Sequence, residues 1–233
     1  MKLMYKWMQE IMHLFYPNLC LGCEQTLLNS EKKICINCWQ QLPQTNFHLQ
    51  ENNLVSERFL GRVSIEHASA MFYFHKDAAL QSILHALKYK NQTTAGELLG
   101  KRMGYLLQSS SWMKDIDILL PVPLAKAKLS ARGYNQSEYI ARGIHEIWPI
   151  PIDTTSVVRN KNTKSQTTMT ITERMENMKD AFAIIDPERL RNKHVLLIDD
   201  VMTTGATLES LSLCLLSSIP LKLSILTVAY AID

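Results

Sequence analysis

Four of the five cysteines lie in two closely spaced pairs near the N-terminus. Cys20 and Cys23 form the first CxxC pair, and Cys35 and Cys38 form the second after eleven intervening residues. Two such pairs can place four thiolates around one zinc ion, about 2.3 Å from each sulfur, and leave no position open for catalysis. The spacing therefore predicts a structural zinc site. Two alternatives stay open, namely two disulfides, which need an oxidising compartment, and four core thiols whose spacing is accidental.

The residues between the two pairs suggest how such a site is built. Gly22 suits a tight first turn, and Asn29–Ser30 is expected to form a turn between two short strands. Cys214 lies far from the pairs in an apolar stretch, so we expect a buried thiol with a packing role.

A second group of candidate functional residues follows a short apolar run near the C-terminus. Residues 195–198 are all apolar and are typical of a buried parallel strand. Asp199 and Asp200 come directly after this run, where ligands bind in open α/β sheets. Two neighbouring carboxylates can accept hydrogen bonds from the vicinal hydroxyls of a sugar. An ordinary strand end with two chance acids is the alternative.

The residues after the acid pair are mostly small and lead into a predicted helix. Backbone N–H groups at a helix N-terminus, with threonine hydroxyls, form a cradle for a phosphate, and Gly205 allows close approach of the backbone. With the acid pair, they predict a ribose 5-phosphate site. The Walker A and dinucleotide fingerprints both fail, because no lysine follows the glycine and only one glycine is present. The predicted phosphate-binding residues are Val201, Met202, Thr203, Thr204, Gly205, Ala206 and Thr207.

Two basic segments precede this site in the sequence. Residues 124–136 carry Lys126, Lys128 and Arg132 without any acid and follow a strand that Pro121 and Pro123 end, so we expect a basic loop suited to a diphosphate. Residues 160–179 are polar and basic on balance, and a long polar segment inside a domain is often a lid. The alternative for both segments is an inert, solvated surface.

The elements that position these residues alternate between strands and helices, which predicts an α/β domain with a mostly parallel sheet. The chain has 233 residues and a net charge of +3, too small for composition alone to indicate a nucleic-acid binder. We expect a zinc module over residues 1–43, a polar linker over 44–58 and the α/β domain over 59–233. Strands are predicted at 70–75, 117–120, 156–159, 195–198 and 221–232, and helices at 80–87, 94–108, 140–147 and 206–218.

The N-terminal segment is amphipathic. Apolar residues recur at helical spacing over residues 3–15, but charged and polar residues interrupt them, so a secretory signal is not expected. The segment is interpreted as a helix docked on its own protein, with weak contact to a membrane surface as the alternative. No apolar run is long enough to predict a transmembrane helix.

Residues 195–207 resemble the phosphoribosyl-diphosphate (PRPP) signature of the type I phosphoribosyltransferases. Together with the four-cysteine module, they resemble the ComF family of competence proteins, over residues 17–230. Asn91 departs from the family, which favours glycine after the Leu-Lys-Tyr stretch, so we expect an altered turn there. The further stretches that carry the resemblance are residues 87–90, 121–124 and 132–136, and Arg159, Thr163, Gln166, Arg174, Asn177 and Phe182.

The resemblance implies a type I phosphoribosyltransferase-like fold that binds PRPP with Mg²⁺ and transfers its ribosyl group with loss of pyrophosphate. Asp199 and Asp200 would orient the ribose, and Arg132 would stabilise the departing pyrophosphate. The implied pyrophosphate-side loop contains Lys126, Lys128, Gly133 and Tyr134, and the implied mobile loop contains Arg159, Thr163, Gln166 and Arg174.

The resemblance also implies a role in natural transformation, with single-stranded DNA and other DNA-uptake proteins as partners. It places the protein in the cytoplasm, with the inner face of the membrane as a further option. The acceptor of a ribosyl transfer stays open. A PRPP sensor and a single-stranded-DNA-binding factor without turnover remain the alternatives to an enzyme. Tyr89 is a candidate contact for single-stranded DNA in such a factor.

Overall fold

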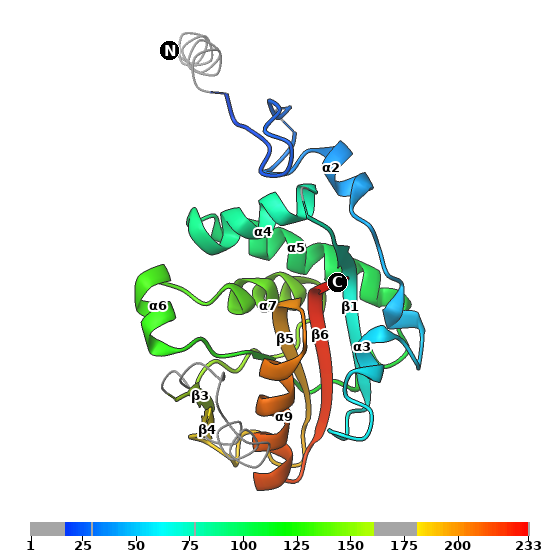
Figure 1. Cartoon of the computed structure of the whole chain (residues 1–233), viewed down its shortest axis with the longest axis vertical. Helices are drawn as coiled ribbons and strands as arrows, with labels where there is room; N and C mark the ends of the chain where they lie inside the picture. Colours follow the sequence, from blue (N-terminus) through cyan, green and yellow to red (C-terminus); the bar gives the residue numbers. More distant parts are fainter. Residues whose placement is uncertain (1–16, 29, 77, 161–180, 233) are drawn as a thin grey trace, which may run out of the picture.

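A four-stranded parallel sheet forms the centre of the molecule. The computed structural model describes residues 17–28, 30–76, 78–160 and 181–232. The sheet has the strand order β1-β6-β5-β2, and all three neighbouring pairs are parallel (Figure 1). Its strands are β1 (His67–Phe74), β2 (Ile118–Pro121), β5 (His194–Met202) and β6 (Lys222–Ala231).

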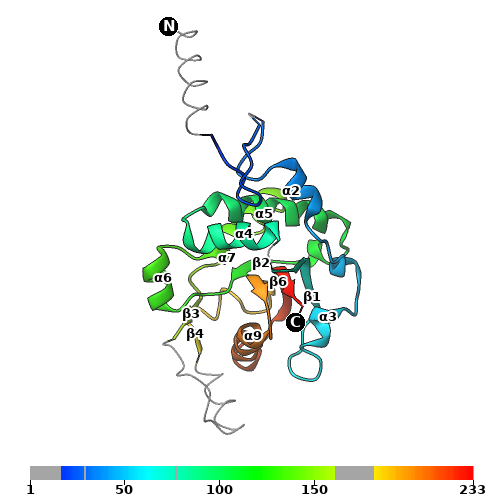
Figure 2. The same ribbon diagram turned by 45° about the horizontal axis from the view of Figure 1, so that its top comes forward.

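Helices cover both faces of this sheet. Figure 2 shows α4 (Ala79–Tyr89), α5 (Thr93–Leu106) and α7 (Gln136–Ile147) above the strands, with α3 (Leu54–Glu57) and α9 (Ala206–Ser218) below them. The described strands and helices confirm the predicted α/β fold with a mostly parallel sheet. A short antiparallel pair, β3 (Val157–Arg159) and β4 (Phe182–Ile184), forms a separate two-stranded sheet.

The apolar pattern of the sequence explains which face each element buries. Leu80, Ile83, Leu84 and Leu87 recur at helical spacing, and all four are buried on the side of α4 that meets the core. In β5, alternate residues pack on opposite faces of the sheet. The sheet is therefore a buried middle layer, as its continuous apolar strands require.

Glycines allow α5 and α7 to pack unusually closely. A Cβ atom built on Gly143 would lie 2.1 Å from the carbonyl oxygen of Glu97, and one built on Gly100 would lie 2.0 Å from that of Ile140. Backbone atoms rather than flexible side chains occupy these positions. Any larger residue must push the two helices apart.

Gly143→Ala should lower the free energy of unfolding by at least about 2 kcal/mol, because the two helix backbones must separate. Gly61→Ala is the control: it has a positive φ of 73° but open space around the new Cβ. The free energy of unfolding of this control should fall by only about 1 kcal/mol, from backbone strain. Urea denaturation measures both values, and equal losses would contradict the packing argument.

Two segments differ from their predicted structure. Residues 44–58, expected to be a linker, contain η1 (Phe47–Leu49) and α3, and the side chains of Phe47 and Val55 are buried against the sheet. The Asn53 side chain caps α3 and donates a hydrogen bond to the Ala68 carbonyl of β1 at 2.9 Å. Residues 126–132, expected to be a loop, form the helix α6 (Lys126–Arg132) instead. Among the described residues, the other short elements are η2 (Leu107–Ser109), η3 (Met113–Asp115) and α2 (Ile36–Gln41).

The cysteine module also differs from its expected local structure. The expected pair of short strands is wrong: among the described residues of the module, its antiparallel pairing is the single bridge between Leu19 and Thr26. The second cysteine pair lies at the beginning of a helix, where Cys35 is the N-cap of α2. The predicted helix over residues 3–15 lies outside the described residues.

Candidate functional site

The four cysteines of the two CxxC pairs come together in space. Their Sγ atoms all lie within 4.8 Å of one another, and the pairs Cys20–Cys38 and Cys23–Cys35 are each 3.7 Å apart. A tetrahedron of sulfurs about 2.3 Å from zinc has edges of about 3.8 Å, whereas a disulfide bond is about 2.05 Å long. The four thiols are free in this structure. Their spacing therefore fits a metal ion and does not fit disulfides.

Backbone N–H groups support a negative charge on the Cys20 sulfur. The amides of Gly22 and Cys35 lie 3.4 Å and 3.2 Å from the Cys20 sulfur. Burial raises the pKa of Cys20, but hydrogen bonds from the backbone outweigh it and bring this pKa down to about 7. A thiol held this way is ready to ligate a metal as the thiolate.

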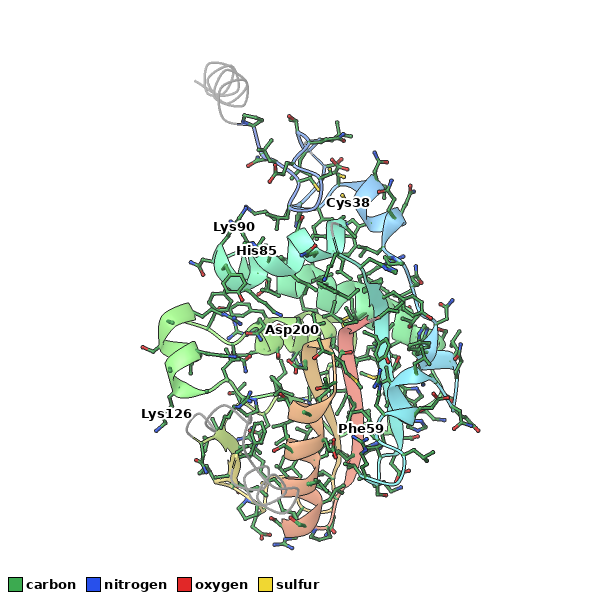
Figure 3. The ribbon with its side chains drawn as sticks, in the orientation of Figure 1. Cys38, Phe59, His85, Lys90, Lys126 and Asp200 are labelled. Atoms are coloured by element: carbon green, nitrogen blue, oxygen red, sulfur yellow. The ribbon has the colours of Figure 1, made fainter. Side chains whose placement is uncertain are left out.

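The cysteine cluster packs directly on the body of the protein. A Cβ atom on Gly22 would lie 2.8 Å from the Cys38 sulfur and 3.1 Å from the Cβ of Ala79, the first residue of α4. Cys20, Cys35 and Cys38 belong to the same hydrophobic cluster as the buried residues of α4 and α5. Figure 3 shows Cys38 above α4. The cluster is therefore positioned to hold residues 20–38 on α4.

An irregular alternation of side chains along β5 lets both acids of the pair line one cavity. Up to Ile198, even-numbered residues pack toward α4, α5 and α7, and odd-numbered residues pack toward α9. Beyond the pair, Val201 packs with the first group and Met202 with the second, so the alternation has shifted by one residue. Regular alternation would send two neighbouring side chains to opposite faces. Instead, Asp199 and Asp200 both line the same cavity.

Each carboxylate has its own partner. Asp200 is buried, and its Oδ2 lies 2.9 Å from the Nζ of Lys88, at the end of α4. Asp199 accepts hydrogen bonds from the Ser137 hydroxyl at 3.0 Å and from the Asp200 amide at 2.9 Å. Burial and the neighbouring charge of Asp200 raise the pKa of Asp199 to about 7. Its charge therefore changes near neutral pH.

The predicted phosphate cradle forms the turn between β5 and α9. Residues 201–208 and Asp199 line a small cavity of about 50 Å³ at the N-terminus of α9. Gly205 has a φ of 79°, and a Cβ there would lie 3.0 Å from the Met202 side chain. This turn therefore requires glycine for its backbone conformation, whereas the flexible end of the Met202 side chain could move aside. The Thr203 and Thr204 side chains are exposed beside the cavity.

The cavity at the acid pair combines carboxylates with a larger number of cations. It has a volume of about 230 Å³, and among the described residues that line it, four are cationic and two are acidic. The cations come from α4, α6 and β3, and they are Lys88, Lys128, Arg132 and Arg159. Such a site fits a ligand that offers hydroxyl groups to carboxylates and phosphates to cations.

The other predicted site residues lie at different distances from this cavity. Gly133 and Tyr134 line a second, larger cavity that adjoins the first. Lys126 lines neither of these cavities, and Figure 3 shows it at the outer edge of α6, away from Asp200. The predicted mobile-loop residues Thr163, Gln166 and Arg174 lie outside the described residues.

Two residues of the site, Lys88 and Ser137, carried no role in the sequence analysis, whereas Tyr89 was a candidate contact for single-stranded DNA. Lys88 pairs with Asp200, Tyr89 lines both cavities, and Ser137 holds Asp199. Lys88 lies in a stretch that resembles the ComF family, which is the signal that could have drawn attention to it. Asn91, where the family favours glycine, has a φ of 52°. This is a left-handed conformation, which glycine adopts freely and asparagine tolerates better than most other side chains.

The chain is similar in sequence to several known competence and DNA utilization proteins. It is 26% identical to competence protein F of Haemophilus influenzae over 207 residues, which cover 85% of this chain and 90% of that protein. The chain is a homologue of competence protein F. It is also 28% identical to the DNA utilization protein YhgH of Escherichia coli, over 59% of this chain and 61% of that protein. Competence protein ComFC of Bacillus subtilis is 31% identical over 42% of this chain and 38% of its own length.

Solved structures similar to this homologue of competence protein F include two enzymes. Glutamine PRPP amidotransferase from B. subtilis is 18% identical with a TM-score of 0.40, over 57% of this chain and 26% of that chain. A hypoxanthine phosphoribosyltransferase from Staphylococcus aureus is 20% identical with a TM-score of 0.35, over 58% and 62% of the two chains. Both similarities concern the fold alone.

A comparison with family models and a search for membrane-spanning helices both gave negative results. No model of a known protein family matches the sequence. In the part of the chain that the structure describes, no helix combines the length and the apolar character needed to cross a membrane.

Proposed function

We propose that this protein binds PRPP with Mg²⁺ at the acid pair of β5 and acts in DNA uptake, as a phosphoribosyltransferase-like protein of the ComF type. The observation that carries the proposal is the cavity in which Asp199 and Asp200 face four cationic side chains, next to the turn that begins α9. A ribose diol, a 5-phosphate and a diphosphate each find matching groups there. The names of the homologues, which refer to competence and DNA utilization, support the role in DNA uptake.

Different residues of the site would contact different parts of PRPP. The carboxylates of Asp199 and Asp200 would accept hydrogen bonds from the ribose hydroxyls, and the backbone of Thr203–Thr207 would hold the 5-phosphate. Arg132 and Lys128 would stabilise charge on the departing pyrophosphate. Bound Mg²⁺ would neutralise part of the diphosphate charge, held mainly by PRPP oxygens and water. In a transfer, the bond from the anomeric carbon to pyrophosphate breaks, and a bond to the acceptor forms.

We further propose that the cysteine cluster holds one structural zinc ion through Cys20, Cys23, Cys35 and Cys38. Four sulfurs leave no position for a substrate, so the ion would stabilise the fold rather than take part in a reaction. We also propose a cytoplasmic location beside the DNA-uptake machinery and contact with the other proteins of that machinery. Contact of residues 3–15 with the inner face of the membrane would be part of that arrangement.

Calorimetric titration with Mg·PRPP tests the central proposal directly. We expect saturable binding of one PRPP per chain, because one acid pair and one phosphate-binding turn form the site. A titration with ribose 5-phosphate should give weaker binding, since it lacks the diphosphate that the cations would contact. Absence of Mg·PRPP binding at millimolar concentration would contradict the proposal.

The raised pKa of Asp199 predicts that Mg·PRPP binding depends on pH. With a pKa of about 7, the ionised fraction of Asp199 falls from about nine tenths at pH 8 to about one tenth at pH 6. Because the ionised carboxylate is the better acceptor for ribose hydroxyls, affinity should fall by about tenfold over this range. Calorimetry at both pH values measures the change.

Asp199→Asn provides the control for this pH dependence. Asparagine keeps the shape of the side chain but does not titrate, so this variant should bind more weakly and lose most of the change between pH 8 and pH 6. Any change that it retains comes from the phosphates of PRPP or from other groups. An unchanged pH profile in the variant would rule out Asp199 as the titrating group.

A further inference from the structure

Residues 58–62 pack against the turn that begins α9, to which the proposed function assigns the 5-phosphate of PRPP. The segment follows α3 and turns back on itself, because the Arg62 amide donates a hydrogen bond to the Phe59 carbonyl at 3.0 Å. The Phe59 side chain is 1% exposed and belongs to the same buried cluster as Val55 of α3 and Leu208 of α9 (Figure 3). The buried ring therefore joins this segment to both helices.

The ring of Phe59 lies against the turn itself. A Cβ atom built on Gly205, the N-cap of α9, would lie 3.4 Å and 3.7 Å from two carbon atoms of this ring. Gly205 has no side chain to hold its own position, so the aromatic ring supplies packing contacts to this part of the turn. Phe59 is not among the residues that line the small cavity there, which are Asp199 and residues 201–208. The ring can therefore act on a bound phosphate only through the turn.

A second contact from the segment reaches the first turn of α9. The Arg62 guanidinium lies 3.4 Å from the Glu209 carboxylate, and the Glu209 amide donates a hydrogen bond to the Gly205 carbonyl at 2.9 Å. A carboxylate in the first turn of a helix competes with a bound anion for the positive end of the helix dipole. Arg62 places a positive charge beside this carboxylate. The ion pair therefore reduces the repulsion that a phosphate at the turn would meet.

The beginning of the segment is also held in place. The Arg58 Nε donates a hydrogen bond to the Tyr230 hydroxyl at 3.1 Å. Tyr230 is the partner of Met202 in the pairing of β6 with β5, and Met202 is the last residue of β5 before the turn. Residues 58–62 are therefore attached both to the strands that lead into the turn and to the helix that leaves it.

We propose that Phe59 and Arg62 are positioning residues for the phosphate-binding turn. The Phe59 ring holds the backbone of Gly205, and Arg62 neutralises Glu209, so the turn is ordered and balanced in charge before the 5-phosphate arrives. A turn that is already ordered loses less conformational entropy on binding. The proposal rests on the proposed function, because it takes the 5-phosphate as the ligand of the turn. Neither residue lines the cavity of the acid pair, so both act on the 5-phosphate and not on the diphosphate.

Phe59→Leu tests the role of the ring with two probes on the full chain, ribose 5-phosphate for the turn and Mg·pyrophosphate for the cations. Calorimetry should show binding of ribose 5-phosphate weakened by at least about fivefold, because a loosened turn must be ordered on binding. The affinity for Mg·pyrophosphate should stay within about twofold of the parent, because the cations do not belong to the turn. Equal losses for the two probes would overturn the role of Phe59.

Phe47→Leu is the matched control for this substitution. Phe47 is another buried ring of the same cluster, and it packs edge to face on Tyr73 and Tyr230. Its substitution should lower the melting temperature about as much as Phe59→Leu does, because both remove a buried ring. It should leave the affinity for ribose 5-phosphate unchanged. Equal effects of the two substitutions on this affinity would show a general loss of stability and overturn the positioning role.

Arg62→Gln tests the balance of charge. It leaves the Glu209 carboxylate without its cation and should weaken ribose 5-phosphate binding by about threefold at low salt, and by less at high salt, where exposed charges are screened. Arg62→Gln with Glu209→Gln should restore the parent affinity, because no carboxylate is left to neutralise. Arg191→Gln is the control, since Arg191 pairs with Glu188 on the surface, and it should bind as the parent does. A double variant as weak as Arg62→Gln would overturn the role of Arg62.

Hydrogen exchange separates this proposal from the proposed function, because it needs no ligand. The amides of residues 203–207 should exchange faster in Phe59→Leu than in the parent, and at the parent rate in Phe47→Leu. Faster exchange in Phe59→Leu, together with a parent that binds neither Mg·PRPP nor ribose 5-phosphate, would reject the proposed function and leave the support of the turn standing. A parent that binds both, with a Phe59→Leu variant that exchanges and binds as the parent does, would reject the positioning role alone.

Discussion

Replacement of both Asp199 and Asp200 by asparagine should weaken Mg·PRPP binding by at least a hundredfold. Asparagine keeps the size of each side chain but removes the charge, and each charge-assisted hydrogen bond contributes about 1.5–3 kcal/mol. Loss of two such bonds therefore costs at least about 3 kcal/mol, or two factors of ten in affinity. The Lys88 ammonium, 2.9 Å from Asp200 in the parent, would also lose its counter-charge. Calorimetry measures the loss, and natural transformation should fail at normal protein levels.

Asp186→Asn is the control for this experiment. Asp186 is an exposed carboxylate that lines none of the cavities around the acid pair, so its substitution should leave Mg·PRPP affinity unchanged. Thermal unfolding of all variants shows whether the fold survives. A double variant that is folded and binds Mg·PRPP as tightly as the parent would reject the site.

Arg132→Ala distinguishes an enzyme from a PRPP sensor. Arg132 lines the cavity of the acid pair. In the proposed complex it would contact the departing pyrophosphate, whose charge is greatest in the transition state. In an enzyme, the substitution should therefore reduce turnover more than it reduces PRPP affinity. In a sensor, it should act through affinity alone.

Cys35→Ser should abolish stoichiometric zinc binding and unfold the cysteine module. Binding of structural zinc contributes about 10–16 kcal/mol in zinc-finger peptides, which are unfolded without the metal. Cys35 is also the N-cap of α2, with its sulfur 3.4 Å from the Cys38 amide. Elemental analysis should give one zinc per parent chain and less than one in the variant, and the variant should be more sensitive to proteases near residue 38.

Cys214→Ser is the matched control for the metal site. Cys214 is the one cysteine of the chain outside the two CxxC pairs. It lies in α9, and its Sγ is 3.6 Å from the carbonyl oxygen of Phe182. Its substitution should leave the zinc content at one per chain. Freshly purified parent protein without zinc, or a Cys35→Ser variant that keeps it, would contradict the assignment.

The sequence predicted the strands of the central sheet, the long helices and the cysteine cluster because each leaves a pattern of buried residues or ligand spacing, whereas β4, α2 and α3 were not predicted. The helix α9 begins and ends where predicted, at Ala206 and Ser218. By contrast, α6 has no buried residue, so no apolar periodicity could indicate a helix there. The strand β5 continues past Ile198 to Met202 because β6 lies beside it over the same length. That pairing is a long-range contact, which a local pattern does not contain.

The partners of the acid pair also come from parts of the chain that local patterns do not connect. Apolar periodicity identifies the buried side of α4, but Lys88 and Tyr89 lie at its end, outside the apolar core. Ser137 reaches Asp199 from 62 residues away. The shift in alternation that brings both acids to one cavity depends on how β5 packs between two layers. The chemistry of the acids could be anticipated, whereas their partners required the fold.

The position of β6 in the sheet has a consequence for how the chain is made. β6 lies between β1 and β5, although it is the last of the four strands in sequence. While the ribosome is still producing residues 222–231, β1 and β5 have no strand between them, and two apolar edges stay open to wrong partners. The cysteine cluster, in contrast, is complete once residue 38 has been made. The parallel sheet can close only after β6 has been made, so its two open edges stay exposed to other chains until that point.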